Sequence, residues 1–454
     1  GRYAAPARHT ARSLWQPATA VLLGLTSLTV AFGLLQKAHC FSKGWNTPDQ
    51  FWHACYSDLP LMYQANSLGH TMPYLPGAQH LDQPLITGVG MWLVGLLVPD
   101  GSATVQQQWY FALSAVLITV IAMVLVAVTV ASVPTTPWRA AHIALSPVLV
   151  LAGLVSVDLL GVLLASVALW AWGRGRVTLA GVMFGVAISA RTYPLVLLVA
   201  IGLLAVRCGK LPAWRRLTAT ALATWFAVSL PWLVMNAGGL LSVYRDWWQA
   251  GASYGSAWVV PSLLGQSLGG GVVTWLPVVG WLVALAVGAL FALSLDRRPT
   301  VAEISLVMLV IVLVTGKAVP VQAGLWLLPL IALVGMQWRD HLIWAGFEAT
   351  YFVAVWLYIA GLSKPERGLP VRWYSALLLL RLAAMLFLVV QVWRVAGSRP
   401  PAGDDEPPTE GNAVDEAELV GENAPVEEAE PWEEIDPLAG PMTGAPDAVL
   451  VRFG

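Results

Sequence analysis

Long apolar segments alternate with short polar stretches along most of this 454-residue chain. Several segments approach the roughly 20 apolar residues needed to cross a bilayer core. They are continuously apolar and do not alternate with period two, and only helices or closed barrels satisfy the backbone inside a bilayer, so we predict helices. We expect an all-α polytopic membrane protein with about twelve membrane helices, at 18–36, 84–98, 109–133, 141–173, 177–191, 193–207, 217–235, 272–295, 301–316, 321–337, 342–361 and 373–393.

Three local patterns refine these helices. The stretch 141–173 is too long for one straight crossing, and we expect it to break near Gly153–Asp158. We expect a tight helical hairpin that turns at residues 191–194, which read Arg-Thr-Tyr-Pro. Thr300 and Glu303 have the spacing of a capping box, which predicts the start of a helix.

The first polar loop, residues 37–83, is the main exception in a chain that is 57% hydrophobic and 11% charged. Such a composition excludes a soluble globule, and polar side chains concentrated in one loop indicate where chemistry takes place. Asp58, at the centre of this loop, is the candidate catalytic residue. On local sequence alone it could equally be a turn residue or cap a helix. The other acids and the histidines noted in the loop are Asp49, Asp82, His53, His70 and His80.

The charge is distributed unevenly along the chain. Residues 1–399 carry a net charge of +13, and residues 400–454 carry −14. We expect three parts: a cytoplasmic N-terminus over 1–17, a membrane domain over 18–395, and an acidic disordered tail over 396–454. The tail is rich in Pro, Gly, Ala and Glu and cannot bury a core. It is either a solvated appendage or a docking element for a protein partner.

Cysteines and basic residues orient the chain by independent arguments. A disulfide between Cys40 and Cys55 would close a loop of about 16 residues and stabilise it by roughly 3 kcal/mol. It requires an oxidising compartment, which places the first loop outside the cytoplasm. Cys208 lies among basic residues and is expected to be a reduced cytoplasmic thiol. The positive-inside rule places both termini in the cytoplasm. The membrane is expected to be the plasma membrane. The basic residues on the inner side are Arg2, Arg8, Arg12, Arg174, Arg176, Arg207, Lys210, Arg215, Arg216, Arg297, Arg298, Arg339, Arg394 and Arg399.

Two cations stand between apolar helices on the outer side. Placing the charged side chains of Arg191 and Lys317 at that depth costs free energy, so they need anionic partners. The partner could be Asp158 or Glu348, or the cations could reach lipid headgroups. Alternatively, they hold the phosphate of a lipid substrate, with Arg as a bidentate fork and Lys as a point charge. Further candidate substrate contacts on this side are Asp82, Arg245, Gln322, Tyr193 and Trp258.

No metal site or cofactor is expected. The histidines His53, His70 and His80 have neither i,i+4 spacing nor a cysteine pattern. The inner loops are too short for a soluble nucleotide-sugar domain, so a sugar donor would have to come from the membrane. Membrane lipids are therefore expected partners, and nucleic acid is not.

At four places the chain resembles the polytopic glycosyltransferases of the C superfamily (GT-C). The nearest resemblance is to family 87, the actinobacterial α-mannosyltransferases that use polyprenyl-phosphate mannose. The resemblance covers about residues 15–395. It rests on Cys55-Tyr56-Ser57-Asp58 with Asp82-Gln83-Pro84-Leu85, on Ser146-Pro147 through Asp158 to Arg176, on Arg191-Thr192-Tyr193-Pro194-Leu195, and on Gly316-Lys317 through Gln322.

The resemblance implies a metal-independent, inverting transfer with Asp58 as the general base. The donor would be a polyprenyl-phosphate sugar, expected to be mannose, whose phosphate is held by Lys317 and Arg191. The acceptor would be a glycolipid, lipoglycan or glycoprotein of the cell envelope. Two other functions stay open: a lipid-linked sugar flippase or transporter, and a non-catalytic scaffold of envelope assembly. A transporter would be expected to place its polar residues near the bilayer midplane.

Overall fold

A computed structural model describes residues 17–266, 268–398 and 436–451, which are helical and contain no strand. The helices are α2 (Pro17–Lys43), α3 (Asp49–Trp52), α4 (Asp58–Ala65), α5 (Leu85–Gly95), α6 (Ala103–Ser132), η1 (Pro137–Ala140), α7 (Ala141–Ala144), α8 (Pro147–Ala152), α9 (Asp158–Gly173), α10 (Val177–Ala190), α11 (Pro194–Arg207), α12 (Leu211–Gln249), α13 (Val259–Leu263), α14 (Gly270–Ser294), α15 (Val301–Val314), η2 (Val321–Ala323), α16 (Gly324–Val334), α17 (Trp338–Ser363), η3 (Pro365–Arg367), α18 (Val371–Ser398) and η4 (Gly440–Met442).

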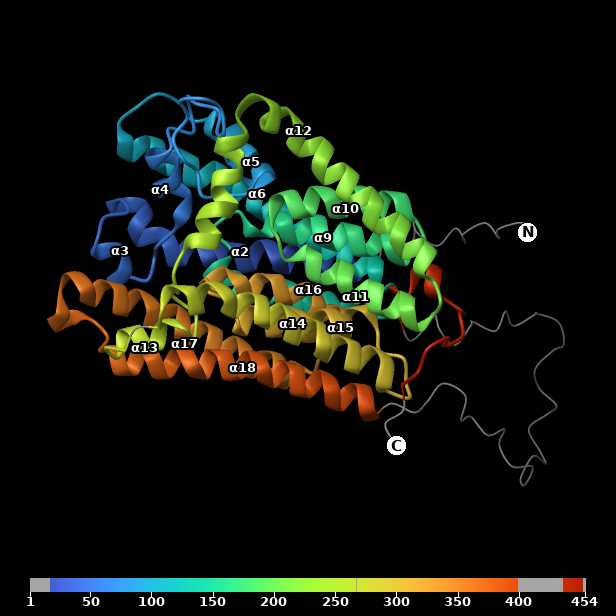
Figure 1. Ribbon diagram of the computed structural model, residues 1–454. Coiled ribbons are helices and arrows are strands. Elements are labelled where there is room, and N and C mark those ends of the chain that lie inside the picture. The colour runs from blue at the N-terminus through green and yellow to red at the C-terminus, as the bar shows by residue number, and fades with distance from the viewer. Residues whose placement is uncertain (1–16, 267, 399–435, 452–454) are drawn as a thin grey trace, which may run out of the picture.

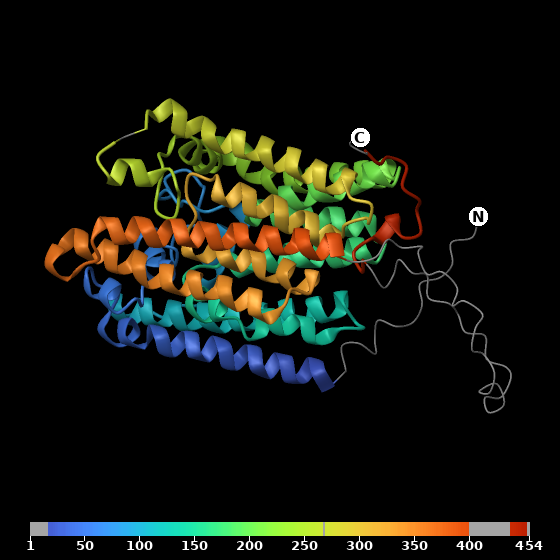
Figure 2. The same cartoon turned by 90° about the horizontal axis from the view of Figure 1, so that it is seen from below.

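Most of the long helices run roughly side by side, so the connections between them collect at two ends (Figures 1 and 2). One end carries α3, α4, α13 and the turn between α17 and α18; we call it the first-loop end. The other carries the start of α2, the turn between α14 and α15, and the described C-terminal segment; we call it the opposite end.

Within the described residues, six helices are long and apolar enough to cross a membrane. This supports an all-α polytopic membrane protein but not the expected count of about twelve spans. The remaining apolar helices have only 10 to 17 residues, which is short for the roughly 20 residues of a full crossing. The six long helices are α2, α6, α12, α14, α17 and α18.

The segment 84–98, expected to cross the membrane, forms the short helix α5 at the first-loop end. Near its start, Thr87 Oγ1 donates a hydrogen bond to Ala190 O, at the end of α10, over 2.8 Å. At its end, Gly95 packs against the backbone of Leu68, where a Cβ on Gly95 would lie 2.7 Å from the carbonyl oxygen. Both ends of α5 thus contact the same end of the bundle, and the prediction of a crossing here is wrong.

The long apolar stretch before α10 breaks at 153–157, as expected. Upstream of the break, the His142 ring stacks on Trp338 at 4.2 Å, at the start of α17. At the break, Val155 O accepts a hydrogen bond from Asp58 N over 2.8 Å. The chain therefore reaches the first-loop end through α7 and α8 and returns through α9.

The start of α15 has the expected capping box. Thr300 Oγ1 accepts from Glu303 N over 3.2 Å, and Glu303 Oε2 accepts from Thr300 N over 2.8 Å. The same carboxylate pairs with Arg297 at 2.9 Å, which the sequence analysis did not anticipate. The turn at 191–194 between α10 and α11 is likewise where it was expected.

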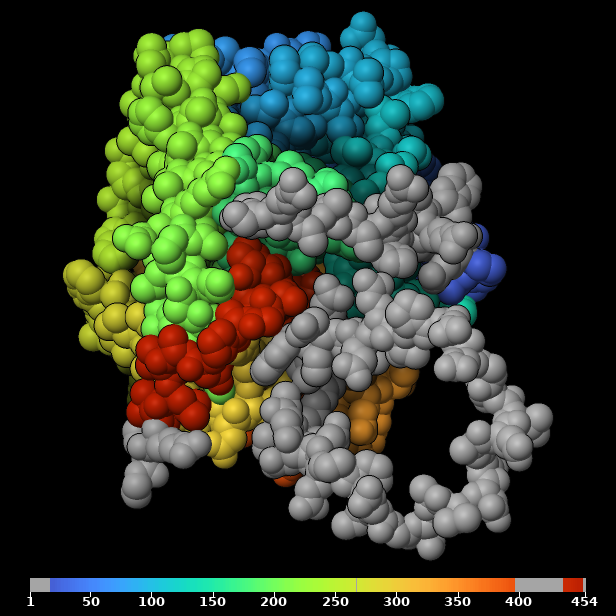
Figure 3. Space-filling model, turned by 90° about the vertical axis from the view of Figure 1, so that its right-hand side faces the viewer, coloured from blue at the N-terminus to red at the C-terminus, as the bar shows by residue number. Residues whose placement is uncertain are grey.

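The prediction of a disordered tail over 396–454 is wrong for residues 436–451. This segment, red in Figure 3, lies across the opposite end of the bundle. Asp447 bridges Arg207 and Arg298, with N–O distances of 2.6 Å to each. Arg207 is fully buried, so its charge requires a partner there, which the average composition of the tail could not reveal. Residues 396–398 of the expected tail are the end of α18. The rest of that tail, 399–435 and 452–454, and the N-terminal residues 1–16 lie outside the described residues.

Candidate functional site

Asp58 is fixed by the start of α4 and by the break between α8 and α9. It is the first residue of α4, after the N-cap Ser57, whose hydroxyl accepts from Leu59 N over 3.3 Å. The same hydroxyl donates to Leu154 O over 2.8 Å. Asp58 N donates to Val155 O, also over 2.8 Å. The backbone on both sides of Asp58 is therefore anchored to the bundle, although the residue lies in a long loop.

The carboxylate of Asp58 is half-buried and bonded to a neighbour. Tyr56 Oη donates to Asp58 Oδ1 over 2.6 Å. Burial raises the pKa of Asp58 to about 6, although the bond from Tyr56 opposes this rise. The charge of Asp158 raises this pKa further, and the charges of Arg191 and Lys37 lower it. Burial also raises the pKa of the Tyr56 phenol, with a further contribution from the negative charge of Asp58, so Tyr56 remains a donor.

Lys37, on α2, bonds to the chain segment just before Asp58. Its ammonium group donates to Tyr56 O over 2.7 Å and lies 5.1 Å from the centre of the Phe352 ring. The side chain is fully buried. A cation in such a place is costly unless it is bonded, so Lys37 is a supporting residue of the site. It precedes Lys43 near the end of a largely apolar helix, a signal that the sequence analysis missed.

Arg191 lies between α10 and α11 and is paired with Asp158, the first residue of α9. This was one of the two acidic partners expected for it. Arg191 Nη1 also donates to Gln83 Oε1 over 2.9 Å. Asp158 accepts two further hydrogen bonds of 2.8 Å, from Ser156 Oγ and from Trp326 Nε1. Arg191 Nη1 also donates to Ala190 O over 3.4 Å. The guanidinium is thus held by one charged and two neutral partners, and its charge lowers the pKa of Asp58.

Glu348, the other expected partner, is paired instead with Arg381 of α18 at 3.0 Å. Arg381 also donates to Val319 O over 2.6 Å and to Pro320 O over 2.9 Å. Both side chains are buried. This pair fixes the chain that follows Lys317, and the role of Arg381 was not foreseen.

Lys317 makes its hydrogen bonds at the end of α12. Its ammonium donates to Trp248 O over 2.6 Å, to Ala250 O over 3.1 Å and to Trp247 O over 3.4 Å. A lysine in this place satisfies the last carbonyls of a helix. Asp58 and Arg191 are therefore brought together electrostatically, whereas Lys317 belongs to a different set of contacts.

Asp82 and Tyr193, two of the candidate substrate contacts, pack beside these groups. Asp82 Oδ1 accepts from Trp247 Nε1 over 2.5 Å, so it connects the first loop to α12. Tyr193 is buried, and its ring stacks on Trp326 at 5.0 Å between ring centres. Since Trp326 also binds Asp158, Tyr193 belongs to the surroundings of the Arg191 pair.

The other three candidates lie elsewhere at the first-loop end. Trp258 Nε1 donates to Thr315 O over 2.9 Å, which ties α13 to the end of α15. Arg245 is exposed near the end of α12, and Gln322 is half-buried in η2.

The expected disulfide between Cys40 and Cys55 is present, with the two Cα atoms 5.8 Å apart. It joins α2 to the chain three residues before Asp58. Cys208 is a buried free thiol, and burial raises its pKa.

Together these features define a class: an all-α integral membrane protein in which a long first loop and two helix ends converge on a carboxylate and an arginine. The family model of glycosyltransferase family 87 matches residues 85–316, just over half of the chain, so the chain belongs to that family. It is therefore a GT-C-type membrane glycosyltransferase. The match includes Asp158 and Arg191 and begins after Asp58. Neither the curated proteins nor the solved structures contain a match to the chain.

Proposed function

We propose that this glycosyltransferase moves mannose from a polyprenyl phosphate to a glycolipid, lipoglycan or glycoprotein of the cell envelope, with inversion and with Asp58 as the general base. The observation that carries this proposal is the setting of Asp58. Its backbone is anchored, the residue is half-buried, and burial raises the pKa of its carboxyl group to about 6, which favours the deprotonated form at neutral pH. A general base is most effective when its pKa lies near the working pH.

The proposed step uses the residues around Asp58 in defined roles. The acceptor hydroxyl oxygen attacks the anomeric carbon and forms the new glycosidic bond. Its proton goes to Asp58, while the bond from the anomeric carbon to the phosphate oxygen breaks and leaves its electron pair on the polyprenyl phosphate. Arg191 stabilises this leaving charge. Its Nη1 donates to the neutral Gln83, a partner that a phosphate oxygen can replace, while Asp158 keeps the guanidinium oriented.

Lys317 is proposed as a second phosphate contact, as the family resemblance implies. Its ammonium now donates to carbonyls at the end of α12, so binding a phosphate would require exchanging at least one of them. No metal ion or other cofactor is needed for this step in the proposal.

We place the first-loop end outside the cell and both termini in the cytoplasm. Arginines at the opposite end support this orientation by the positive-inside rule. Arg174, at the end of α9, donates to Ala131 O at the end of α6, and Arg207 and Arg298 meet at Asp447. The disulfide at the first-loop end fits an oxidising compartment.

The proposal is tested by incubating the purified protein with envelope lipids and mannose labelled in one of two donors. One donor is polyprenyl-phosphate mannose and the other is a nucleotide-linked mannose. We expect label in a lipid or protein acceptor only from the polyprenyl donor. Transfer from the nucleotide donor would contradict the proposal, and movement of the intact polyprenyl donor across liposomes without transfer would favour a flippase. A comparison of envelope glycans with and without the gene would then identify the acceptor.

A further inference from the structure

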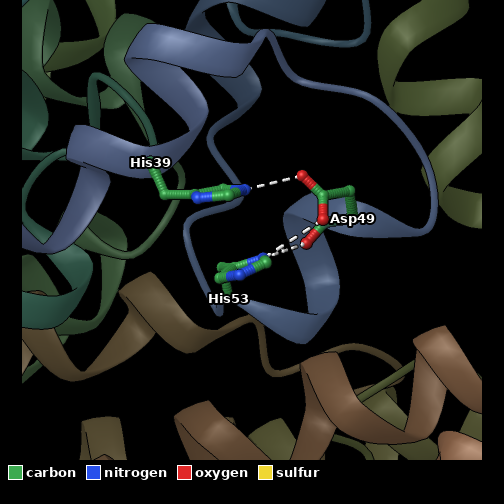
Figure 4. A group of neighbouring side chains, drawn as sticks. All are labelled: His39, Asp49 and His53. Carbon is green, nitrogen blue, oxygen red and sulfur yellow. Dashed lines mark hydrogen bonds and ion pairs between the residues drawn. The ribbon is translucent and has the colours of Figure 1, made fainter.

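Three side chains of the first loop converge at a place that the proposed reaction does not use (Figure 4). His39 Nε2 lies 2.7 Å from Asp49 Oδ2, and His53 Nδ1 lies 3.3 Å from Asp49 Oδ1. One ligand atom from each residue lies within 4.8 Å of the others. The two imidazole rings are stacked, with their centres 3.5 Å apart. Two imidazoles thus face one carboxylate, and His53 Nδ1 also lies 3.0 Å from the main-chain oxygen of Asp49.

The chain holds these residues in place by covalent and local contacts. His39 is on α2, Asp49 is the first residue of α3, and His53 directly follows that helix. The disulfide joins Cys40, the neighbour of His39, to Cys55, two residues after His53. The two sides of the cluster are therefore cross-linked independently of any bound ion, and little chain entropy is lost when a ligand joins them.

We propose that His39, Asp49 and His53 form a binding site for a divalent transition-metal ion, with Zn²⁺ as the best fit. Two imidazole nitrogens and one carboxylate are a common zinc ligand set, with water as the fourth ligand. Ca²⁺ and Mg²⁺ prefer sites made of oxygen atoms, so they fit this set poorly. Zinc bonds of about 2.0–2.1 Å in a tetrahedral site separate the ligand atoms by about 3.3 Å. His53 Nδ1 lies 3.3 Å from Asp49 Oδ1, and His39 Nε2 lies 2.7 Å from the other oxygen, Oδ2. An imidazole binds metal through a lone pair in its ring plane, so one of the two stacked rings has to turn for both to reach the same ion.

The site is open to an entering ion. The side chains of His39, Asp49 and His53 are 34%, 40% and 46% exposed, which leaves room for a water ligand. The ion would link α2 to α3 and to His53, beside the disulfide that links α2 to Cys55. Its role is to fasten the loop that carries Asp58, and it takes no part in the transfer reaction. The site therefore stands independently of the proposed substrate.

The test uses the full-length protein in detergent, with any affinity tag removed and with metal stripped by a chelator. Zn²⁺ alone is added, excess ion is removed by gel filtration, and bound zinc is counted by mass spectrometry. We expect about one zinc per chain and a rise in melting temperature of several degrees. His39→Ala and His53→Ala should each weaken zinc binding at least 10-fold and abolish the temperature shift. The exposed His70, in the same loop, provides the matched control: His70→Ala should bind zinc like the wild type.

A second measurement on the unmodified protein guards against variants that misfold. Co²⁺ in a four-coordinate site gives strong visible absorption, whereas six-coordinate Co²⁺ gives weak bands. Strong absorption that disappears when Zn²⁺ is added would support the site. Weak bands only, no zinc retained after filtration, or equal zinc retention in the wild type and in properly folded His39→Ala would each overturn the proposal.

Discussion

The phenol of Tyr56 donates a hydrogen bond to the carboxylate of Asp58 over 2.6 Å, across the single residue that caps α4. This bond favours the ionised carboxylate and opposes the rise in pKa that burial produces. Tyr56→Phe keeps the ring against Trp356, 4.5 Å away, but removes the donor. The pKa of Asp58 should then rise above its present value of about 6.

The proposed base acts only when deprotonated, so transfer should fall as pH drops through the pKa of Asp58. For the wild type we expect the rising limb of kcat/KM to have its midpoint near pH 6. For Tyr56→Phe the limb should move to higher pH, with a rate close to that of the wild type on the alkaline plateau. A pH–rate profile of both proteins measures this. Identical limbs would contradict the role of the hydrogen bond.

Gly161 makes room for Arg191 beside Asp158. A Cβ on Gly161 would lie 2.8 Å from Arg191 Cγ, so the arginine stem would have to move. We expect Gly161→Ala to cost about 1–3 kcal/mol, the usual cost of overpacking, and to reduce transfer by weakening donor binding. Gly24→Ala, with no atom within 4 Å of its Cβ, is the control. Equal apparent donor affinity in the two variants would argue against a phosphate contact by Arg191.

The Cys40–Cys55 disulfide should stabilise the first loop. Reduction, or Cys40→Ser with Cys55→Ser, is expected to cost about 3 kcal/mol through the entropy of the opened loop. Thermal unfolding with and without reductant measures this cost. The free thiol provides the control, since Cys208→Ala should leave the response to reductant intact. A melting temperature that reductant does not change would contradict the prediction.

Asp447 should hold the C-terminal segment to the bundle. Asp447→Asn removes the charge that bridges Arg207 and Arg298, and we expect a loss of about 2 kcal/mol, typical of hydrogen bonds to charged groups. Limited proteolysis should then release residues 436–451 faster, while transfer activity is kept. Asp296→Asn, at an exposed position near the same turn, is the comparison. Equal protease resistance in both variants would show that Asp447 does not anchor the segment.

Much of the fold could be predicted because hydrophobic runs and local signals act over short distances. The break at 153–157, the turn at 191–194 and the cap formed by Thr300 and Glu303 all follow from neighbouring residues. The prediction that α5 crosses the membrane failed for a different reason. Its composition suits a membrane helix, but its length and its contacts with Ala190 and Leu68 keep it at one end of the bundle.

The surroundings of the candidate site could be predicted only in part. The sequence offered Asp158 and Glu348 as partners for Arg191, and only tertiary packing decides between them. Lys37 supports Tyr56, and His39 converges with Asp49, although α2 carries only the first residue of each pair. Neither pair has a short spacing pattern. The docking of Asp447 depends on a buried arginine more than 200 residues away in the chain.

The account depends most on Asp58 as the general base. The direct test is transfer of labelled mannose from polyprenyl-phosphate mannose by purified wild type and Asp58→Asn. Asparagine has nearly the same shape but cannot take a proton, and removal of a general base typically costs about 10²–10⁴-fold in rate. We expect a loss of at least that size, with unchanged folding and donor binding. A variant that folds normally and transfers mannose at the wild-type rate would contradict the account.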